Sequence, residues 1–421
     1  MIEQREILRR RDMRDVFTFT IDPADAKDFD DALSFAVNED GTYQIGVHIA
    51  DVSFYVKPNT FIDDEAYKKG TSVYLVDRVI PMLPENLCND KCSLKPDEEK
   101  LCMSVIFTMN TEAKVLKYKI CRTVIRSDMR LTYDAVPDIE AIRVMTEMAQ
   151  KMRAERIANG ALTIEQDEIR FKLDKNGHPT DIYFEQPNES HHLIEEFMLL
   201  ANKTVATAVG SGRPFVYRVH DLPDSEKLEE VKKFKRQCAM TAKMRHREVS
   251  QETVQRAVDM LTIRAQAKAV YSTYNIGHYG LAFSHYTHFT SPIRRYPDLM
   301  VHRLVEKYIL TGKPISLTRE ELEEKCEHCS ACEQEAAQAE RDSIKLYQAI
   351  WMNDHVGEIL PGHISGVTEF GFFVQLDDSR CEGLVHMMTI EHPEDYVLGD
   401  PVNVQVVRVD INRAQMDFEF A

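Results

Sequence analysis

An acidic stretch near the N-terminus constrains the fold of this chain more than any other feature. Residues 20–32 read TIDPADAKDFDDA and follow a segment, residues 16–21, that is rich in β-branched and aromatic side chains. Such a segment is typical of a β-strand, and Pro23 stops its pairing. Apolar residues resume at 32–37, which predicts a second strand after the acidic loop. The stretch contains five aspartates within ten positions: Asp22, Asp25, Asp28, Asp30 and Asp31.

Aspartates crowded in this way repel one another, and their proximity raises their pKa values. A divalent cation would relieve that repulsion, and carboxylate oxygens favour Mg²⁺ or Mn²⁺ over zinc. Phe29 and the flanking apolar strands draw the loop toward a core. The stretch is not an EF-hand, because the required glycine and distal glutamate of that motif are missing. A solvated acidic turn is the alternative interpretation of the same residues.

The whole chain predicts an α+β fold with two domains. Strand patterns at 42–56, 101–110 and 115–127 make residues 1–130 mostly β, and we expect His48 and Asp51 to lie near the acidic loop. Helical patterns then dominate at 139–158, 193–209, 225–236, 252–271, 297–310 and 320–351, with a hairpin at 164–185. After residue 353, five short strands with glycine turns indicate a small barrel of the OB type. We therefore predict a mixed α/β domain at 1–353 and an all-β OB-fold barrel at 354–421.

Composition restricts the setting in which such a chain works. The 421 residues carry a net charge of −17 and nine cysteines, and no apolar run approaches the ~18 residues of a membrane span. The charged N-terminus lacks the apolar segment of a signal peptide, so we expect a cytoplasmic protein without membrane or disulfide partners. Net negative charge argues against nucleic-acid binding. Bound cations would offset part of that charge, and basic residues concentrate at 114–130 and 232–247, so a basic channel stays compatible with the sequence.

A second stretch, residues 286–299, combines prolines with arginines in the sequence YTHFTSPIRRYPDL. Two prolines fix the backbone around Arg294 and Arg295, and Pro297 is expected at the first position of a helix. Arginine forks and the free N–H groups of a helix start both favour phosphate oxygens. The alternative is a helix-start loop with surface arginines.

Three cysteines at intervals of three residues lie in a glutamate-rich helical segment, with His328 between them. They are Cys326, Cys329 and Cys332. This spacing fits no standard zinc or iron–sulfur site, so packing as small apolar side chains is the favoured interpretation. His285 and His288 lack an HExxH pattern and are expected to pack or to contact phosphate. Cys88 and Cys92 are interpreted as structural.

Aromatic residues in the predicted barrel are candidates for stacking on RNA bases. Strict alternation places Phe370 and Phe372 on one face and Phe373 on the other, and His386 follows in a later strand. The alternative is that these rings fill the interior, as aromatic residues do in small barrels.

Taken together, the two stretches make the chain resemble the ribonuclease II/ribonuclease R family of 3′→5′ exoribonucleases, in particular its ribonuclease R branch. The resemblance runs from about Asp12 to Phe420 and rests on several long motifs in the same order. They are TIDPADAKDFDDA (20–32), GVHIADVS (46–53), IPMLP (80–84), HLIEEFMLLAN (192–202), YRVHDLP (217–223), NIGHYGLAFSHYTHFTSPIRRYPDLMVHR (275–303) and AERDSIKLY (339–347). The C-terminal GHISGVTEFGFFVQL and EGLVHM look like the RNA-binding barrel first described in ribosomal protein S-one.

The resemblance implies a hydrolase with a two-metal mechanism that uses Mg²⁺, or Mn²⁺ as an alternative ion. Its metal ligands by family pattern are Asp22, Asp28, Asp30 and Asp31. Asp28, Asp30 and Arg294 carry the chemistry, and loss of Asp30 should abolish cleavage while sparing RNA binding. Arg294 would steady the scissile phosphate, with Arg295 as a helper.

The same resemblance implies contacts with single-stranded RNA. Tyr74 fits a clamp on the 3′-terminal base, and Tyr133 fits a position that helps to set the distance to the last cleavable nucleotide. Glu196, with Glu195 as a second choice, fits a position that stacks or bonds near the terminal nucleotides. Contacts to 2′-hydroxyls would distinguish RNA from DNA.

The chain departs from the family pattern in its RNA-gripping parts. Family members normally carry a pair of cold-shock-type domains before the catalytic domain, whereas this chain begins almost directly at the catalytic strand. Residues 387–398 are too few for the usual excursion of the barrel, and Phe54 stands where a histidine is frequent.

Three functions follow from these features. The first is a processive, metal-dependent exoribonuclease, acting as a monomer, that degrades single-stranded RNA from its 3′ end to nucleoside 5′-monophosphates. The second is a non-catalytic RNA-binding protein on an exonuclease scaffold, which the intact aspartate set disfavours. The third is a metal-dependent phosphodiesterase acting on small molecules, which fits the missing N-terminal domains.

Overall fold

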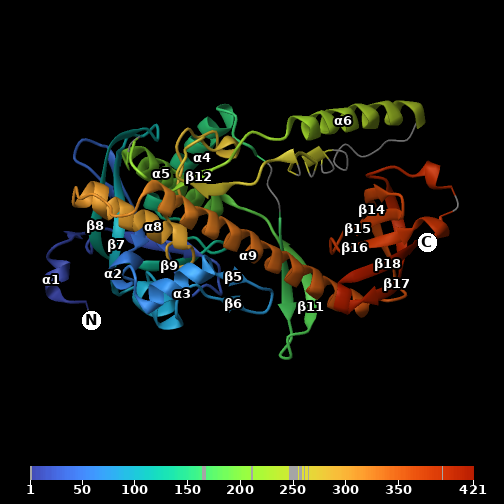
Figure 1. Cartoon of the computed structure of the whole chain (residues 1–421), viewed down its shortest axis with the longest axis horizontal. Coiled ribbons are helices and arrows are strands. Elements are labelled where there is room, and N and C mark those ends of the chain that lie inside the picture. The colour runs from blue at the N-terminus through green and yellow to red at the C-terminus, as the bar shows by residue number, and fades with distance from the viewer. Residues whose placement is uncertain are drawn as a thin grey trace.

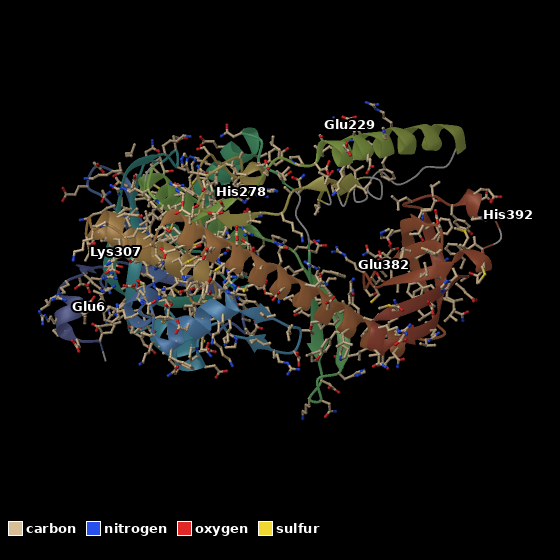
Figure 2. All side chains as sticks on the ribbon, viewed as in Figure 1. Glu6, Glu229, His278, Lys307, Glu382 and His392 are labelled. Atoms are coloured by element: carbon tan, nitrogen blue, oxygen red, sulfur yellow. The ribbon has the colours of Figure 1, made fainter. Side chains whose placement is uncertain are left out.

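A seven-stranded sheet, a set of helices and a C-terminal barrel make up the chain, and one long helix joins the sheet region to the barrel (Figure 1). The computed structural model describes residues 2–163, 167–209, 212–245, 255, 258–259, 261–263, 265–390 and 392–421. In Figure 2, Glu6 of the N-terminal segment and His392 of the barrel mark opposite ends of the molecule. The predicted α+β class is confirmed.

The large sheet brings the ends of the acidic loop together. Its strands β2 and β3 pair antiparallel, with Phe19 opposite Leu33, while the edge strand β9 runs parallel to β2. In spatial order the strands are β1 (Arg11–Asp12), β8 (Val115–Arg126), β7 (Glu99–Met109), β4 (Tyr43–Ala50), β3 (Asp31–Val37), β2 (Thr18–Asp22) and β9 (Met129–Thr132).

The central strands are apolar and buried along most of their length. In β7 every residue from Lys100 to Phe107 is buried, as expected for a strand covered on both faces. The helices that pack with this sheet and around it are α1 (Gln4–Ile7), α2 (Val52–Tyr55), α3 (Phe61–Lys69), α4 (Glu140–Ala158), α5 (Glu189–Val209), α8 (Tyr296–Val305) and α9 (Arg319–Asn353). Helix α6 (Ser225–Arg245) extends away from the sheet (Figure 1). Short π-helical turns are η1 (Asn86–Cys92) and η3 (Glu306–Leu310), and η2 (Tyr279–Leu281) is a 3₁₀ turn.

Three small two-stranded sheets connect these layers. The pairs are β5 (Val73–Tyr74) with β6 (Val79–Ile80), β10 (Glu168–Leu173) with β11 (Pro179–Glu185), and β12 (Tyr217–Val219) with β13 (Val270–Ser272). Helix α9 runs past β13, β5 and β11 on its way to the barrel (Figure 1). A capping box at Thr318 and Glu321 starts this helix.

The C-terminal strands close into the small barrel that the sequence predicts. The order is β14 (Ile359–Thr368), β15 (Gly371–Leu376), β16 (Glu382–His386), β18 (Gln415–Phe420) and β17 (Pro401–Asp410), with 3₁₀ turns η4 (Met387–Thr389), η5 (Pro393–Asp395) and η6 (Ile411–Arg413). Val374, Val385 and Val404 are fully buried in its core. Ala349 and Met352 of α9 belong to the same apolar cluster, so the last turns of α9 form part of the barrel's packing.

Two predicted elements differ in the structure. The strand pattern at 42–56 ends at Ala50, because Asp51 caps the short helix α2 by accepting a hydrogen bond from Phe54 N. In the predicted helix at 252–271, residues 255, 258–259, 261–263 and 265 are helical, and residues 252–254, 256–257, 260 and 264 lie outside the described residues. The last two residues of that prediction, Val270 and Tyr271, belong to β13 instead. Within the described ranges, no helix is both long and apolar enough to cross a membrane.

Candidate active site

The acidic loop between β2 and β3 is fixed mainly through its backbone. Ala50 N donates a hydrogen bond to Asp30 O (2.9 Å), and Leu94 N donates to Phe29 O (3.0 Å). The hydroxyl of Ser93 accepts from Phe29 N (3.0 Å) and donates to Lys27 O (2.8 Å). Because these contacts use main-chain groups, the aspartate carboxylates remain available for other partners.

Burial dominates the electrostatics of these carboxylates. It raises the pKa of Asp22 to about 8, with the charge of Asp31 as the second cause, and it raises the pKa of Asp31 to about 6. Burial also raises the pKa of Asp28, and it raises that of Asp30 well above its ordinary value. Arg294 offsets part of this effect at Asp28, Asp30 and Asp31, so the arginine lies within electrostatic reach of all three.

The loop that precedes α8 meets the acidic loop at Asp30. Asp30 Oδ1 accepts a hydrogen bond from Ile293 N (2.8 Å), and Asp30 Oδ2 lies 3.6 Å from Arg294 Nε. The Arg294 side chain is 43% exposed and its Nη2 donates to Ser291 Oγ (3.1 Å). The structure thus places a solvent-accessible guanidinium beside a buried carboxylate, an arrangement that suits an incoming phosphate.

The residues at this point fit a divalent cation. Asp22 Oδ2 and Asp30 Oδ2 are buried and have no hydrogen-bond partner among the described residues, although such atoms normally find one. In the same residues, no three His, Cys, Asp or Glu side chains converge in a way that could hold a metal ion alone. Mg²⁺ is commonly bound by one or two carboxylates together with water and substrate phosphates. The donor set therefore fits an ion that substrate helps to hold.

A cavity lies beside the acidic loop rather than at these carboxylates. It has a volume of about 940 Å³ and is lined by Ala26, Lys27, Phe29, Glu85, Asn86, Asn89, Asp90, Lys95, Pro96, Glu98 and Arg130. None of the four predicted metal ligands lines it. We place the candidate site at Asp30 and Arg294, because the chemically reactive groups meet there.

Arg295 has a different position from Arg294. Its guanidinium donates to both carboxylate oxygens of Asp298, at 2.9 Å from Nε and 2.8 Å from Nη2, and its side chain is 18% exposed. The predicted role as a phosphate helper conflicts with this pairing, because the donors are already used within the protein.

The two predicted RNA-contacting tyrosines lie close to the carboxylates. Burial is the largest cause of the raised pKa of each tyrosine. The charges of Asp28 and Asp30 raise the pKa of Tyr74 further, and those of Asp31 and Asp22 raise the pKa of Tyr133 further. Tyr74 is 39% exposed, whereas Tyr133 stacks on His191 with ring centroids 3.7 Å apart. Both rings border the same site.

The two candidate glutamates on α5 pair with one arginine of α4. Glu196 is 3% exposed and accepts hydrogen bonds from Arg156 Nε (3.1 Å) and Nη2 (2.5 Å), while Glu195 accepts from the same Nη2 (3.2 Å). An RNA contact by Glu196 would compete with this buried ion pair. Glu195, whose side chain is 45% exposed, is the more accessible of the two.

The predicted shared face of Phe370 and Phe372 is wrong. Phe370 is 76% exposed, whereas Phe372 is 2% exposed in the barrel core. The reason is that residues 369–370 form a turn and β15 begins only at Gly371, so the alternation does not extend back to Phe370. His386 stays exposed and lies 3.3 Å from Asp417. Phe370 and His386 remain candidates for an RNA contact, and Phe372 does not.

The cysteines and histidines described next are buried or have partners within the protein. Cys326 and Cys329 are buried, and His328 Nε2 contacts Tyr67 O at 2.8 Å. His288 bonds the hydroxyl of Tyr271 (2.8 Å). His48 lies within β4 and Asp51 directly follows it, and Ala50 N of the same strand donates a hydrogen bond to Asp30 O in the acidic loop. His48 nonetheless bonds Ser34 and Ser104, so its ring does not join the carboxylates.

Three residues that sequence reasoning missed support the site: Ser93, Ser291 and Asp298. They hold the acidic loop, the Arg294 side chain and the Arg295 guanidinium respectively. Of these, only Asp298 leaves a readable signal, because an aspartate three residues after an arginine at a helix start is well spaced for pairing.

Two known protein families match the two parts of this chain, the sheet region and the barrel. The RNB domain matches residues 10–311 and the S1 RNA binding domain matches residues 353–420. Ribonuclease R of Thermotoga maritima is 38% identical over 465 residues, and the alignment covers 99% of this chain but 66% of that protein. The chain therefore spans less than two thirds of the length of that relative.

Solved structures share the fold. RNase R of Mycoplasma genitalium in complex with ribose methylated single-stranded RNA has a TM-score of 0.90 at 25% identity, covering 100% of this chain and 73% of that one. Yeast Ssd1, described as a pseudonuclease, has a TM-score of 0.75 at 20% identity, covering 92% of this chain and 51% of that one. The second likeness concerns the fold alone. From the RNB match over residues 10–311 and the identity with ribonuclease R, the chain belongs to the RNB family that includes ribonuclease R.

Proposed function

We propose that this chain is a 3′→5′ exoribonuclease that hydrolyses single-stranded RNA processively and releases nucleoside 5′-monophosphates. The observation that carries the proposal is that Asp22 and Asp30 have buried, unsatisfied carboxylate oxygens and that the oxygen of Asp30 lies 3.6 Å from the accessible guanidinium of Arg294. Such a set is unfavourable in a resting protein unless a cation and a phosphate complete it. Its relatives include ribonuclease R, so RNA is the substrate we expect.

We assign the cation to Asp22, Asp28, Asp30 and Asp31, with Mg²⁺ as the expected ion and Mn²⁺ as the alternative. When bound, two such ions polarise the phosphate and lower the pKa of an attacking water. The protein itself supplies Arg294, which offsets charge on the phosphate, and the backbone contacts that hold Asp30 in place. We assign contacts with the terminal bases to Tyr74 and Tyr133, and the influence of the aspartates on the pKa values of both tyrosines supports that assignment.

The barrel would grip RNA farther from its 3′ end through exposed rings. Phe370, in the turn before β15, lies beside His386 at the end of β16, because Gly371 pairs with His386 and Met387 N donates to Phe370 O (2.9 Å). Stacking on aromatic rings tolerates any base sequence, which suits degradation without sequence preference. A monomer acting in the cytoplasm is the setting that we infer.

The test is a time course on 5′-labelled single-stranded RNA with Mg²⁺, beside an Asp30→Asn protein. We expect the full-length band to disappear into one short limit product, and the variant to bind RNA without cleaving it. An even ladder of products would retain the chemistry but contradict processivity. Intact RNA with the wild-type protein would overturn the proposal.

A non-catalytic RNA-binding protein is the second candidate, since a pseudonuclease shares the fold. Intact RNA that remains bound, together with no Mg²⁺ or Mn²⁺ uptake in a metal titration, would favour it. The set of four aspartates weighs against this candidate. A preference for a dinucleotide over long RNA would instead favour a small-molecule phosphodiesterase.

A further inference from the structure

Asp298 is a buried carboxylate in the first turn of α8 that has no part in the function proposed above. It is fully buried and accepts three hydrogen bonds: from Ser291 N (2.8 Å), Arg295 Nη2 (2.8 Å) and Arg295 Nε (2.9 Å). One side chain thus ties both ends of the loop 291–295 to the start of the helix. Arg294 is the residue inside that loop that reaches the candidate site.

The remaining backbone bonds of the loop point Arg294 toward Asp30. Arg295 N donates to Ser291 O (3.0 Å), and Ile293 N donates to Asp30 Oδ1 (2.8 Å). Arg294 O accepts from Ser72 N (2.9 Å) and from Thr71 Oγ1 (3.0 Å). The main chain on both sides of Arg294 is therefore held, and the hydroxyl of Ser291 also accepts from its guanidinium.

Asp298 also decides which of two neighbouring arginines faces the acidic loop. Arg295 directly follows Arg294, whose Nε lies 3.6 Å from Asp30 Oδ2, so without a partner its guanidinium would be drawn to the same acidic loop. The two-point contact with Asp298 satisfies that charge and matches the fork geometry of the guanidinium. Arg294, which makes a single side-chain hydrogen bond to a hydroxyl, stays free to meet a phosphate.

We propose that Asp298 is a positioning residue, which holds the loop 291–295 and sequesters Arg295 so that Arg294 alone presents its guanidinium beside Asp30. This inference rests on the proposed function, because Arg294 is taken to contact the phosphate that is cleaved. Asp298 itself touches neither substrate nor metal.

The test is a double-mutant cycle between Asp298→Asn and Arg294→Ala. Single-turnover cleavage of 5′-labelled RNA with Mg²⁺ is measured for the wild type, both single variants and the double variant. Misplacement by about 1 Å costs about 10²-fold in rate, so we expect that loss for Asp298→Asn, mostly in kcat rather than KM. In the Arg294→Ala background, the same change should cost less than about threefold, because the group that Asp298 positions is already gone.

A matched control separates positioning from general damage. Asp63 is another buried aspartate, which pairs with Arg303 (2.7 Å) and accepts from the hydroxyl of Tyr296 (2.9 Å), without contacting the loop 291–295. Asp63→Asn should lower thermal stability but leave the cleavage rate of the folded protein within about threefold of wild type. Asp298→Glu keeps the charge for Arg295 and should recover part of the lost rate. If Asp298→Asn fails to fold, Asp298→Glu replaces it in the cycle.

Several outcomes would overturn the inference. They are a wild-type rate in Asp298→Asn, an equal loss in both backgrounds of the cycle, and an equal loss in Asp63→Asn. If the wild-type protein does not cleave RNA at all, the proposed function fails separately. Asp298 is then tested by the dissociation constant of single-stranded RNA across the same four proteins, where non-additive losses support positioning and additive losses overturn it.

Discussion

Asp30 and Asp51 are two buried aspartates at neighbouring ends of strands, directly before β3 and directly after β4, and their surroundings differ sharply. Ala50 N, next to Asp51, donates to Asp30 O, so the two residues sit on adjoining segments. Asp51 Oδ2 forms ion pairs with Arg10 (2.8 Å) and Arg122 (3.2 Å), although neither contact has the angles of a hydrogen bond. Its Oδ1 accepts from Ser53 (2.6 Å). Asp30 has one backbone donor and an arginine at 3.6 Å.

The pKa values of the two carboxyl groups are shifted in opposite directions. Burial acts to raise the pKa of each carboxyl, but Arg10 and Arg122 lower that of Asp51 below its ordinary value, whereas that of Asp30 stays raised. Burial alone therefore does not distinguish structure from function. The distinguishing feature is whether the protein itself neutralises the buried charge or leaves that to a ligand.

The largest effect that we expect comes from Asp30→Asn. Removing a carboxylate that the cation needs should lower the cleavage rate by about 10³-fold or more, since a metal contributes several kcal/mol to such a reaction. Asp30 has one backbone donor, Ile293 N, and an arginine at 3.6 Å, and burial disfavours its charged form, so the melting temperature should change little. Gel assays and a thermal melt measure both quantities. A variant that cleaves normally would exclude the acidic loop as the reactive site.

Asp51→Asn should show the reverse pattern. It removes the buried carboxylate that Arg10 and Arg122 share and leaves Arg10 with Glu6 as its acidic partner, which should lower the free energy of unfolding by about 3–5 kcal/mol. Urea unfolding measures this loss. Asp12→Asn is a matched control, because Asp12 pairs with Arg14 at a site where its side chain is 51% exposed, and we expect a loss below about 1 kcal/mol. Equal losses would show that the Asp51 network adds little.

A parallel contrast between exposed and buried aromatic residues can be tested in the barrel. Phe370→Ala should weaken single-stranded RNA binding by about 1–3 kcal/mol, the usual value of one stacked base, without changing stability. Phe372→Ala should instead destabilise the barrel by about 3–5 kcal/mol. Fluorescence anisotropy and thermal unfolding separate the two effects. Unchanged RNA binding in Phe370→Ala would remove the ring from the proposed RNA face.

The smallest effect concerns pH. Burial raises the pKa of Asp22 to about 8 and that of Asp31 to about 6, so these groups stabilise the metal-free fold most at low pH. As pH rises from about 4 to 8, the unfolded chain releases protons that the folded chain retains, and stability falls.

Mg²⁺ binds the ionised carboxylates, so its stabilisation should be larger at pH 8 than at pH 6. A tenfold excess over Kd corresponds to about 1.4 kcal/mol. Melting temperatures with and without Mg²⁺ measure the difference, and Asp22→Asn should reduce it. A larger Mg²⁺ effect at pH 6 would contradict the raised pKa values.

The crowding of aspartates in the acidic loop was predictable from the sequence because its residues are contiguous. Asp22 to Asp31 lie between two strands whose patterns are clear, so their crowding follows from the loop alone. The approach of Arg294 to Asp30 is a long-range contact, and only the resemblance to the family indicated it. The barrel was predictable from its strand spacing, whereas its outer face was not.

The error at Phe372, and the contacts that compete with the roles predicted for Arg295 and Glu196, have local physical causes. Phe372 was misplaced because Gly371, with a φ of 155°, ends a turn that interrupts the alternation of the strand. The role expected for Arg295 overlooked Asp298, whose carboxylate is reached only when the helix start forms. The accessibility of Glu196 depends on Arg156 of another helix, a pairing that no local pattern indicates.

Helix α9 holds two parts of the molecule at a fixed distance from each other. Its 35 residues span about 50 Å, and it is attached at two places. Glu340 accepts from Tyr74 N (3.0 Å) and the hydroxyl of Ser343 accepts from Val76 N (3.1 Å), while Ala349 and Met352 pack into the barrel. The hairpin that carries Tyr74 and the barrel are therefore held at one separation. An RNA strand long enough to reach from the Tyr74 hairpin to the barrel would be held at both. A strand shortened below that length would be held at only one of them, so RNA binding would weaken at a defined RNA length.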